Sequence, residues 1–224
     1  MGFLWGAAHD QVPPQERAPL STALWILASY LLGATPTSYV AGRLGRGIDL
    51  REHGSKNLGA TNVYRILGWS YAIPVGIIDV AKGVIPAALF GRWAHGPEWL
   101  PVTLGGAAVL GHMFSPYVRF KGGKGVATAA GVFLALAPWA FAIALPFWGL
   151  SLWLTGFVSL SSIAAALTFP LWVRLTAGGG ATFWASIVLA LLIVVAHRAN
   201  VGRLLAGTEN RFRTRGERPV EMRE

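Results

Sequence analysis

Residues 125–173 read GVATAAGVFLALAPWAFAIALPFWGLSLWLTGFVSLSSIAAALTFPLWV, which is 49 residues without an Asp, Glu, Lys or Arg. An uncharged apolar stretch of about 18 residues or more is typical of a membrane span. As one helix this run would be roughly 74 Å long, against a hydrocarbon core of ~30 Å. The run therefore predicts several passes through a membrane.

Three further runs lack charged residues: Leu20–Gly42, Trp99–Val118 and Leu175–His197. All 29 charged residues of the 224-residue chain lie outside the four runs. The sequence excludes an ordinary soluble domain and a disordered chain, and the absence of Cys excludes a disulfide scaffold. Because backbone in lipid must satisfy its own hydrogen bonds, we expect an all-α polytopic membrane protein.

Basic residues assign the sides of the membrane. They cluster after the first run, after the 99–118 run and in the tail: Arg43, Arg46, Arg51, Lys56, Arg65; Arg119, Lys121, Lys124; Arg198, Arg203, Arg211, Arg213, Arg215, Arg218, Arg223. Arg17, Arg92 and Arg174 are isolated. The positive-inside rule puts the clusters in the cytoplasm and the isolated residues outside. The net charge of +9 then reflects orientation and anionic lipid rather than nucleic acid.

The same assignment fixes the number of spans. We expect spans at about 20–43, 69–91, 98–118 and 181–199, and an odd number within 125–173. Three short spans of about 15–17 residues, broken near Pro138 or Pro146 and near Gly156, satisfy this parity. The prediction is seven transmembrane helices with the amino terminus outside and the carboxyl terminus cytoplasmic. It divides the chain into an extracytoplasmic extension (1–19), a seven-span domain (20–210) and a basic cytoplasmic tail (211–224).

The first polar segment, 53–65, reads HGSKNLGATNVYR. Glycine-rich backbone with hydroxyl and amide side chains can form an anion-binding concavity, and a guanidinium suits a phosphate. The candidate residues are Ser55, Asn57, Thr61, Asn62 and Arg65. An ordinary positive-inside loop with turn residues is the alternative, at even odds when the segment is taken alone.

The second polar segment combines GHMF (111–114) with FKGGKGVAT (120–128). A basic glycine turn that opens a helix offers backbone N–H groups, ammonium groups and the positive end of the helix dipole. We therefore expect an anion cradle rather than a plain basic hairpin. It differs from a Walker A loop, because Val118 stands where Gly is required and Gly125 where Ser or Thr is required. The candidate residues are His112, Lys121, Gly122, Gly123, Lys124, Gly125 and Thr128.

The third polar segment, 197–209, reads HRANVGRLLAGTE. If the last helix continues, Asn200 lies one turn from both His197 and Arg203. Structural hydrogen bonding by the histidine and stop-transfer charges are the alternatives to a functional reading. The candidate residues are His197, Arg198, Asn200, Arg203 and Glu209.

Asp79 and Lys82 stand three residues apart inside the second span. Charges at that depth are costly and indicate a functional site, with a structural ion pair as the alternative. Other chemistries are missing, because the sequence has no Gly-x-Ser-x-Gly, no His-Glu-x-x-His and no His followed five residues on by Asp. We predict no metal and no cofactor.

The three segments together resemble the bacterial acyl-phosphate:glycerol-3-phosphate acyltransferases, the PlsY family. The resemblance covers about Leu20 to Arg211 and includes the Asp79–Gly83 segment. Two departures are visible: Phe114-Ser115-Pro116 stands where Phe-Pro is common, and the tail after Asn210 is long and basic. Family members are seven-span proteins, which agrees with the parity argument.

The resemblance implies transfer of a fatty acyl group from acyl phosphate to the 1-hydroxyl of glycerol 3-phosphate. The products are lysophosphatidate and phosphate, in the first acylation of bacterial phospholipid synthesis. It implies a bacterial inner membrane location, a site facing the cytoplasm, contact with membrane lipid, and the acyl-phosphate-forming enzyme as a candidate partner. An anion transporter and a non-catalytic lipid-binding protein are the rival classes, but the sequence has no internal repeat and its polar motifs lie on one side.

Roles follow from matching positions. Ser55, Arg65 and Lys124 are expected to hold the phosphate of glycerol 3-phosphate, helped by His197. The 121–125 turn is expected to hold the acyl phosphate and to stabilise its departing phosphate. Hydroxyl groups and loop backbone are expected to be oriented by Asn57, Thr61, Asn62 and Asn200. Asp79 and Lys82 are expected to shape the floor of the site, and Glu209 to tie the tail to the basic cluster. His112, His197 or a substrate phosphate oxygen is the proton acceptor, and the substrate is preferred.

Overall fold

The computed structural model describes residues 19–212, and within them the chain forms helices and no strand. The predicted extension at 1–18 and the tail beyond residue 212 lie outside the described residues. The longer helices are α1 (Pro19–Ala34), α4 (Trp69–Val84), α6 (Leu100–Met113), α7 (Val126–Leu136), α8 (Pro138–Thr155), α9 (Val158–Thr176) and α10 (Ala181–Ala196). Shorter ones are α2 (Thr37–Arg46), α3 (Ala60–Leu67), the π-helix η1 (Ile85–Phe90), α5 (Gly91–Ala94), the 3-10 turn η2 (Pro116–Val118) and α11 (Arg198–Leu205).

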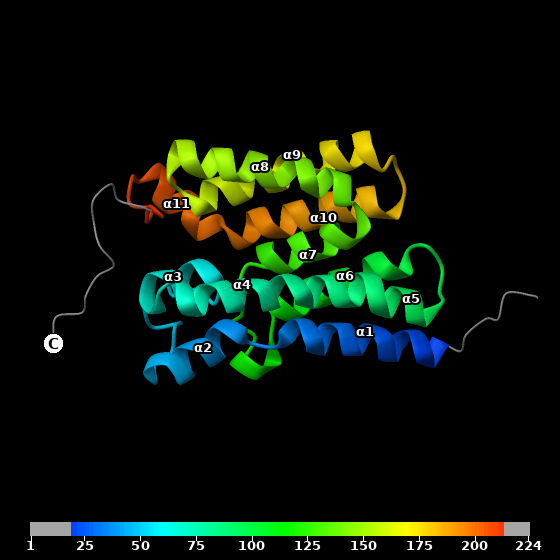
Figure 1. Ribbon diagram of the computed structural model, residues 1–224, viewed down its shortest axis with the longest axis horizontal. Helices are drawn as coiled ribbons and strands as arrows, with labels where there is room; N and C mark the ends of the chain where they lie inside the picture. The colour runs from blue at the N-terminus through cyan, green and yellow to red at the C-terminus, as the bar shows by residue number, and fades with distance from the viewer. Residues whose placement is uncertain (1–18, 213–224) are drawn as a thin grey trace, which may run out of the picture.

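The long helices form two layers (Figure 1). α8, α9 and α10 make one layer, α1, α4 and α6 make the other, and α7 lies between them and packs on α4. The short helices α2, α3 and α11 gather at one end, and α5 lies at the opposite end. The first and third polar segments, which contain α3 and α11, therefore lie at the same end of the bundle.

The outer surface of the bundle is apolar. Leucine and isoleucine side chains such as Leu27, Ile77, Leu154 and Leu191 are more than half exposed. Such a surface suits contact with lipid. By length and composition, Trp69–Ala94, Pro138–Thr155 and Val158–Thr176 could each cross a membrane. A fourth span results if Ala181–Ala196 and Arg198–Leu205, bent by 56°, are taken together.

Two predicted spans end earlier than expected. The span at 20–43 stops at Ala34, because Pro36 has no N–H to continue the helix, and α2 starts afresh at Thr37. The span at 181–199 breaks at His197, where the chain turns into α11. In both places residues expected to be within the membrane form a short helix at the end of the bundle.

The uncharged run 125–173 contains three helices. α8 starts at Pro138 and ends where Gly156 adopts φ 76°, while Pro146 lies inside the helix. The helices have 11, 18 and 19 residues, so they are less equal than the predicted 15–17. Proline at a first helical position and glycine past the last one explain the break points.

The helices α4 and α7 approach closely through two glycines. A Cβ on Gly83 would lie 2.0 Å from the Thr128 carbonyl oxygen, and a Cβ on Gly131 would lie 2.0 Å from that of Val80. Small residues permit this backbone approach, as is common between helices in membranes. The contact holds the charged segment of α4 against the start of α7.

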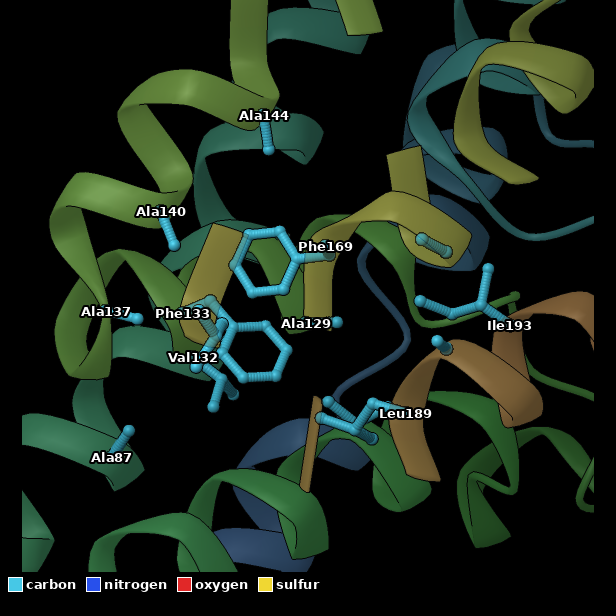
Figure 2. Packing of buried hydrophobic residues seen from close by; sticks show 14 of the residues in the cluster. Ala87, Ala129, Val132, Phe133, Ala137, Ala140, Ala144, Phe169, Leu189 and Ile193 are labelled. Carbon is cyan, nitrogen blue, oxygen red and sulfur yellow. The ribbon is translucent and has the colours of Figure 1, made fainter. Parts of the chain in front are cut away.

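An apolar core lies between α7, α8, α9 and α10 (Figure 2). The rings of Phe133 and Phe169 are in contact, tilted by 44° with centroids 4.5 Å apart, and Leu189 and Ile193 of α10 pack nearby. Small residues of α8, including Ala140 and Ala144, complete the cluster. Their size leaves room beside the rings for the inner part of the cavity described next.

Candidate active site

One large cavity, of about 460 Å³, joins the polar end of the bundle to its apolar interior. This volume lies in the range of small-molecule sites, roughly 300–1,000 Å³. Twelve of the residues singled out in the sequence line it: Ser55, Asn57, Thr61, Asn62, Arg65, Asp79, His112, Lys124, Gly125, His197, Asn200 and Glu209. All three polar segments and the charged part of α4 therefore contribute to one site.

Asn62 shapes the loop that precedes α3. Its side chain is buried, and its Nδ2 donates to the carbonyl oxygens of Leu50 and His53, each at 3.1 Å. Its Oδ1 accepts the backbone N–H of Ser55 at 2.8 Å. These bonds fold the loop around the amide and place Ser55 on the cavity wall.

Lys124, Asn200 and Glu209 form a chain of contacts across the mouth of the cavity. Lys124 Nζ donates to Asn200 Oδ1, and Asn200 Nδ2 donates to Glu209 Oε1 at 2.6 Å. Arg203 Nε donates to Glu209 Oε2 at 2.7 Å. Ser159 Oγ also donates to Glu209 Oε1, at 2.7 Å. The chain ties the loop before α7 to α9, α11 and the tail.

Burial and neighbouring charges set the protonation of this chain. Burial lowers the pKa of Lys124 to about 8, opposed by Glu209 and reinforced by Arg203 and Arg65. Burial alone would raise the pKa of Glu209, but hydrogen bonds from Asn200, Ser159 and Arg203 hold it below its usual value. The site therefore has a permanent carboxylate and an ammonium that titrates near neutrality.

Arg65 projects from α3 into the same region. Its Nη2 donates to the carbonyl oxygen of Asn210 at 3.3 Å, and the side chain lines the cavity. Burial lowers the pKa of Arg65, while Glu209 opposes that shift. Within residues 19–212 this is the one hydrogen bond of the side chain, so most of the five guanidinium donors can bind an oxyanion.

His197 lies where α10 ends, and its side chain is buried against the cavity. Its Nδ1 lies 2.8 Å from the Ile193 carbonyl oxygen. Because a carbonyl only accepts, Nδ1 carries the proton and Nε2 presents a lone pair. This ring can accept a hydrogen bond from a hydroxyl group in the cavity.

The charged pair of α4 is fully buried. Lys82 Nζ lies 2.7 Å from Asp79 Oδ1 and donates to the Thr35 carbonyl oxygen at 2.8 Å. Thr37 Oγ1 donates to Asp79 Oδ1 at 2.5 Å. Asp79 lines the cavity, whereas Lys82 lies behind the wall. The pair therefore combines both sequence interpretations, because it is an ion pair and also part of the site's floor.

The glycine turn differs from the expected cradle. The N–H groups of Gly122 and Gly123 donate to the carbonyl oxygens of Met113 and His112, each at 3.1 Å. They close the end of α6 and cannot also bind an anion. The cavity is lined instead by Lys124, Gly125 and the first residues of α7, where helical N–H groups lack intrahelical partners. Of the predicted 121–125 turn, only Lys124 and Gly125 therefore line the cavity.

Several predicted site residues lie away from the cavity. Lys121 is exposed, and so is Arg198, whose Nη1 contacts the Val195 carbonyl oxygen at 3.4 Å. Thr128 is buried on α7 beside Gly83, and its Oγ1 has no hydrogen bond among the described residues. Arg203 does not line the cavity, and its contact with the site is the hydrogen bond to Glu209.

Sequence reasoning missed the residues of the apolar run that line the inner cavity. Ser159, Ser162 and Ser186 lie among apolar residues, and Trp148 Nε1 donates to Ser162 Oγ at 3.2 Å. Phe133, Phe141 and Phe169 supply aromatic walls. Serines spaced at helical intervals were the available signal, but serine is also common where membrane helices simply pack.

Comparisons with known proteins agree with one another. Residues 23–207 match the family model described as glycerol-3-phosphate acyltransferase. The chain is 47% identical to the glycerol-3-phosphate acyltransferase of Desulforudis audaxviator and 40% identical to that of Chlorobium luteolum, covering 86% of this chain and 96% and 97% of those proteins.

Two solved structures have the same fold. Both are crystal structures of PlsY, an integral membrane glycerol 3-phosphate acyltransferase. The glycerol 3-phosphate form gives a TM-score of 0.82 at 39% identity, over 87% of this chain and 96% of that one. The lysophosphatidic acid form gives 0.78 at 38% identity, over 85% and 95%.

Proposed function

The chain belongs to the glycerol-3-phosphate acyltransferase family, and we propose that the cavity described above is the site where it joins its two substrates. The protein is a membrane-bound enzyme that transfers a fatty acyl group from acyl phosphate to glycerol 3-phosphate, giving lysophosphatidate and phosphate. One observation carries the assignment of the site: a polar end that includes Arg65 and Lys124 is continuous with an apolar interior. Such a cavity suits two phosphates and one acyl chain.

Different residues at the polar end of the cavity bind the two substrates. Ser55, Arg65 and Lys124 hold the phosphate of glycerol 3-phosphate, because two cations and a hydroxyl converge there. Asn57, Thr61 and Asn200 orient hydroxyl groups. The backbone from Lys124 to Ala127, at the amino-terminal end of α7, receives the acyl phosphate.

The reaction needs no covalent enzyme intermediate, because acyl phosphate carries a good leaving group. The 1-hydroxyl oxygen forms a bond to the carbonyl carbon, and the bond from that carbon to the bridging phosphate oxygen breaks. The electron pair leaves with the phosphate, which also takes the hydroxyl proton. Holding both substrates in line can supply about 7–11 kcal/mol of the barrier reduction. His197 Nε2 orients the attacking hydroxyl.

The inner cavity holds the acyl chain. Its wall consists of aromatic, alanine and aliphatic side chains from α7, α8, α9 and α10: Phe133, Phe141, Ala144, Leu145, Ala165, Ala166, Phe169, Leu189, Ala190 and Ile193. Burial of each methylene group contributes about 0.8 kcal/mol. A fatty chain is therefore bound along its length while its phosphate stays at the polar end.

The membrane orientation extends the same proposal. α1, the continuous α4–α5 stretch, α6, α7, α8, α9 and α10 are the seven spans, with the amino terminus outside and the site facing the cytoplasm of a bacterial inner membrane. Exposed Trp93, Trp99 and Trp184 at one end, and Trp69 and Trp153 near the other, support two interfacial belts. An acyl-phosphate-forming enzyme stays a predicted partner.

Phosphate release from palmitoyl phosphate tests the function directly. With purified protein in detergent, we expect release to depend on glycerol 3-phosphate and to be matched mole for mole by lysophosphatidate. The control omits glycerol 3-phosphate and supplies glycerol, which lacks the phosphate. Equal release with and without glycerol 3-phosphate would refute the proposed reaction.

A larger residue in the inner cavity should shorten the chains that the enzyme accepts. Ala190 lies seven residues before His197 on α10, about 10 Å deeper along the helix axis. Ala190→Phe fills that level, so we expect kcat/KM for palmitoyl phosphate to fall about 10-fold or more, because overpacking costs about 1–3 kcal/mol. Octanoyl phosphate should be used nearly as well as by the parent enzyme.

The matched control is Val188→Phe, on the same helix but 56% exposed on the outer surface. It adds the same ring without entering the cavity, so its chain-length profile should equal that of the parent enzyme. Equal losses with both donors in Ala190→Phe would show that this part of the cavity does not hold the acyl chain.

A further inference from the structure

The Lys82 ammonium group has three buried acceptors. Besides Asp79 Oδ1 at 2.7 Å and the Thr35 carbonyl oxygen at 2.8 Å, it lies 3.3 Å from Nδ1 of His112. An ammonium group has three N–H donors and no acceptor. Each of the three N–H donors of Lys82 therefore has one acceptor, and the acceptor of the third N–H is Nδ1 of His112.

This match fixes the tautomer of His112. A proton on Nδ1 would point at the ammonium group, and the carboxylate oxygen that could receive it, Asp79 Oδ1, is 3.8 Å away, beyond hydrogen-bond distance. Lys82 and His112 are both buried, with 3% and 8% of their surface exposed, so water cannot separate them. Nδ1 is consequently bare, and the proton of the neutral ring is on Nε2.

The Nε2 edge of His112 lies beside the glycine turn. A Cβ on Gly123 would be 2.2 Å from His112 Nε2, so only glycine lets the turn lie against this ring. His112 lines the cavity together with Lys124 and Asp79. Among residues 19–212, Nε2 makes no hydrogen bond, so its N–H can be donated to a bound molecule.

The two histidines of the cavity therefore have opposite tautomers. His197 has its proton on Nδ1 and offers a lone pair at Nε2, whereas His112 has its lone pair on Nδ1 and offers a proton at Nε2. Two titratable side chains of one site that are held in different protonation states have different chemical roles. His112 is thus unsuited to act as the general base, although the sequence had left that role open to it.

We propose that His112 donates its Nε2–H to the carbonyl oxygen of the acyl phosphate, and that Lys82, bound to Asp79 and Thr35, is the positioning residue that keeps the ring in this tautomer. This inference rests on the proposed function. The carbonyl oxygen gains negative charge as the 1-hydroxyl oxygen attacks and returns it when the phosphate leaves. A neutral, preorganised donor stabilises that developing charge, while the cations are occupied with phosphate.

The tautomer can be observed without any activity measurement. In the full chain, labelled with ¹⁵N-histidine and held in detergent, the His112 signals are assigned by their loss in His112→Gln. We expect the Nε2 resonance to be that of a protonated nitrogen and the Nδ1 resonance that of a bare one. A protonated Nδ1 would overturn the inference, whatever the activities of the variants.

Two amide substitutions test the donor in the reaction. Glutamine places its NH₂ group near the position of Nε2, whereas asparagine reaches only the position of Nδ1. We expect His112→Asn to lower kcat about 10²–10³-fold, the usual effect of removing one oxyanion donor. His112→Gln should restore at least about a tenth of the parental kcat, with KM for glycerol 3-phosphate unchanged in both.

Equal activities of the two variants would overturn the donor role, and so would a change confined to KM. Failure of the proposed function is distinguishable from these outcomes. In that case the parent protein itself would release no phosphate in response to glycerol 3-phosphate, and the tautomer would still be read from the ¹⁵N signals.

Discussion

We expect Arg65→Ala to lower kcat/KM for glycerol 3-phosphate by about 10²- to 10⁴-fold. Removal of one partner of a buried charge contact costs about 3–5 kcal/mol, and each 1.4 kcal/mol corresponds to a tenfold change. Arg65 lines the cavity and makes one long contact, at 3.3 Å, to the Asn210 carbonyl oxygen. Most of its donors are therefore available to the substrate phosphate. Initial rates at varied glycerol 3-phosphate measure the loss.

Arg65→Lys separates charge from geometry in the same assay. A lysine keeps the positive charge but cannot make the two parallel hydrogen bonds of a guanidinium, so its activity should lie between alanine and the parent. The control is Arg46→Ala, since Arg46 is exposed at the end of α2 and does not line the cavity. Near-parental activity of Arg65→Ala would remove this residue from the site.

Lys124→Met is expected to reduce kcat/KM by about 10³-fold, because it deletes a charge-assisted phosphate contact and leaves Asn200 Oδ1 without its ammonium donor. Methionine keeps most of the length and apolar volume of the side chain. The variant should therefore fold, which its elution profile and thermal midpoint in detergent check, while phosphate release falls.

The pH profile tests the same ammonium group independently. Burial lowers the pKa of Lys124 to about 8, so the cation is present below that pH and is lost as pH rises through it. We expect kcat/KM to fall about tenfold per unit above pH 8, since one proton is lost. In Lys124→Arg the fall should move to higher pH, because arginine stays charged. An unmoved alkaline limb would assign the titration to another group.

The residue types and their spacing were sufficient to predict an all-helical fold and a site whose polar residues lie on one side of the membrane. Charge-free runs predicted helices in a membrane, because hydrophobic length and backbone hydrogen bonding leave few alternatives. The motifs at 53–65, 120–128 and 197–209 contribute to one cavity, as expected from their placement on the basic side of the spans. Twelve of the nineteen predicted site residues line one cavity, and each of the other seven lies within three residues of one that does.

Helix boundaries were less predictable, because they depend on local backbone chemistry within apolar segments. The break at Pro36 and the bend at His197 shorten two spans that hydropathy alone extends. Both breaks have a role in the site: the first exposes the Thr35 carbonyl oxygen to Lys82, and the second lets Asn200 and Arg203 reach Glu209.

The sequence by itself determined that this protein is a helical membrane protein whose polar motifs are separated from its uncharged runs, because charge content and periodicity act locally along the chain. Only the tertiary structure decided which donors are free. Gly122 and Gly123 use their N–H groups on α6, and His112 has its tautomer set by Lys82, thirty residues away. Hydrogen bonds are exclusive, so the chemistry left to each group depends on partners that only the folded chain brings together.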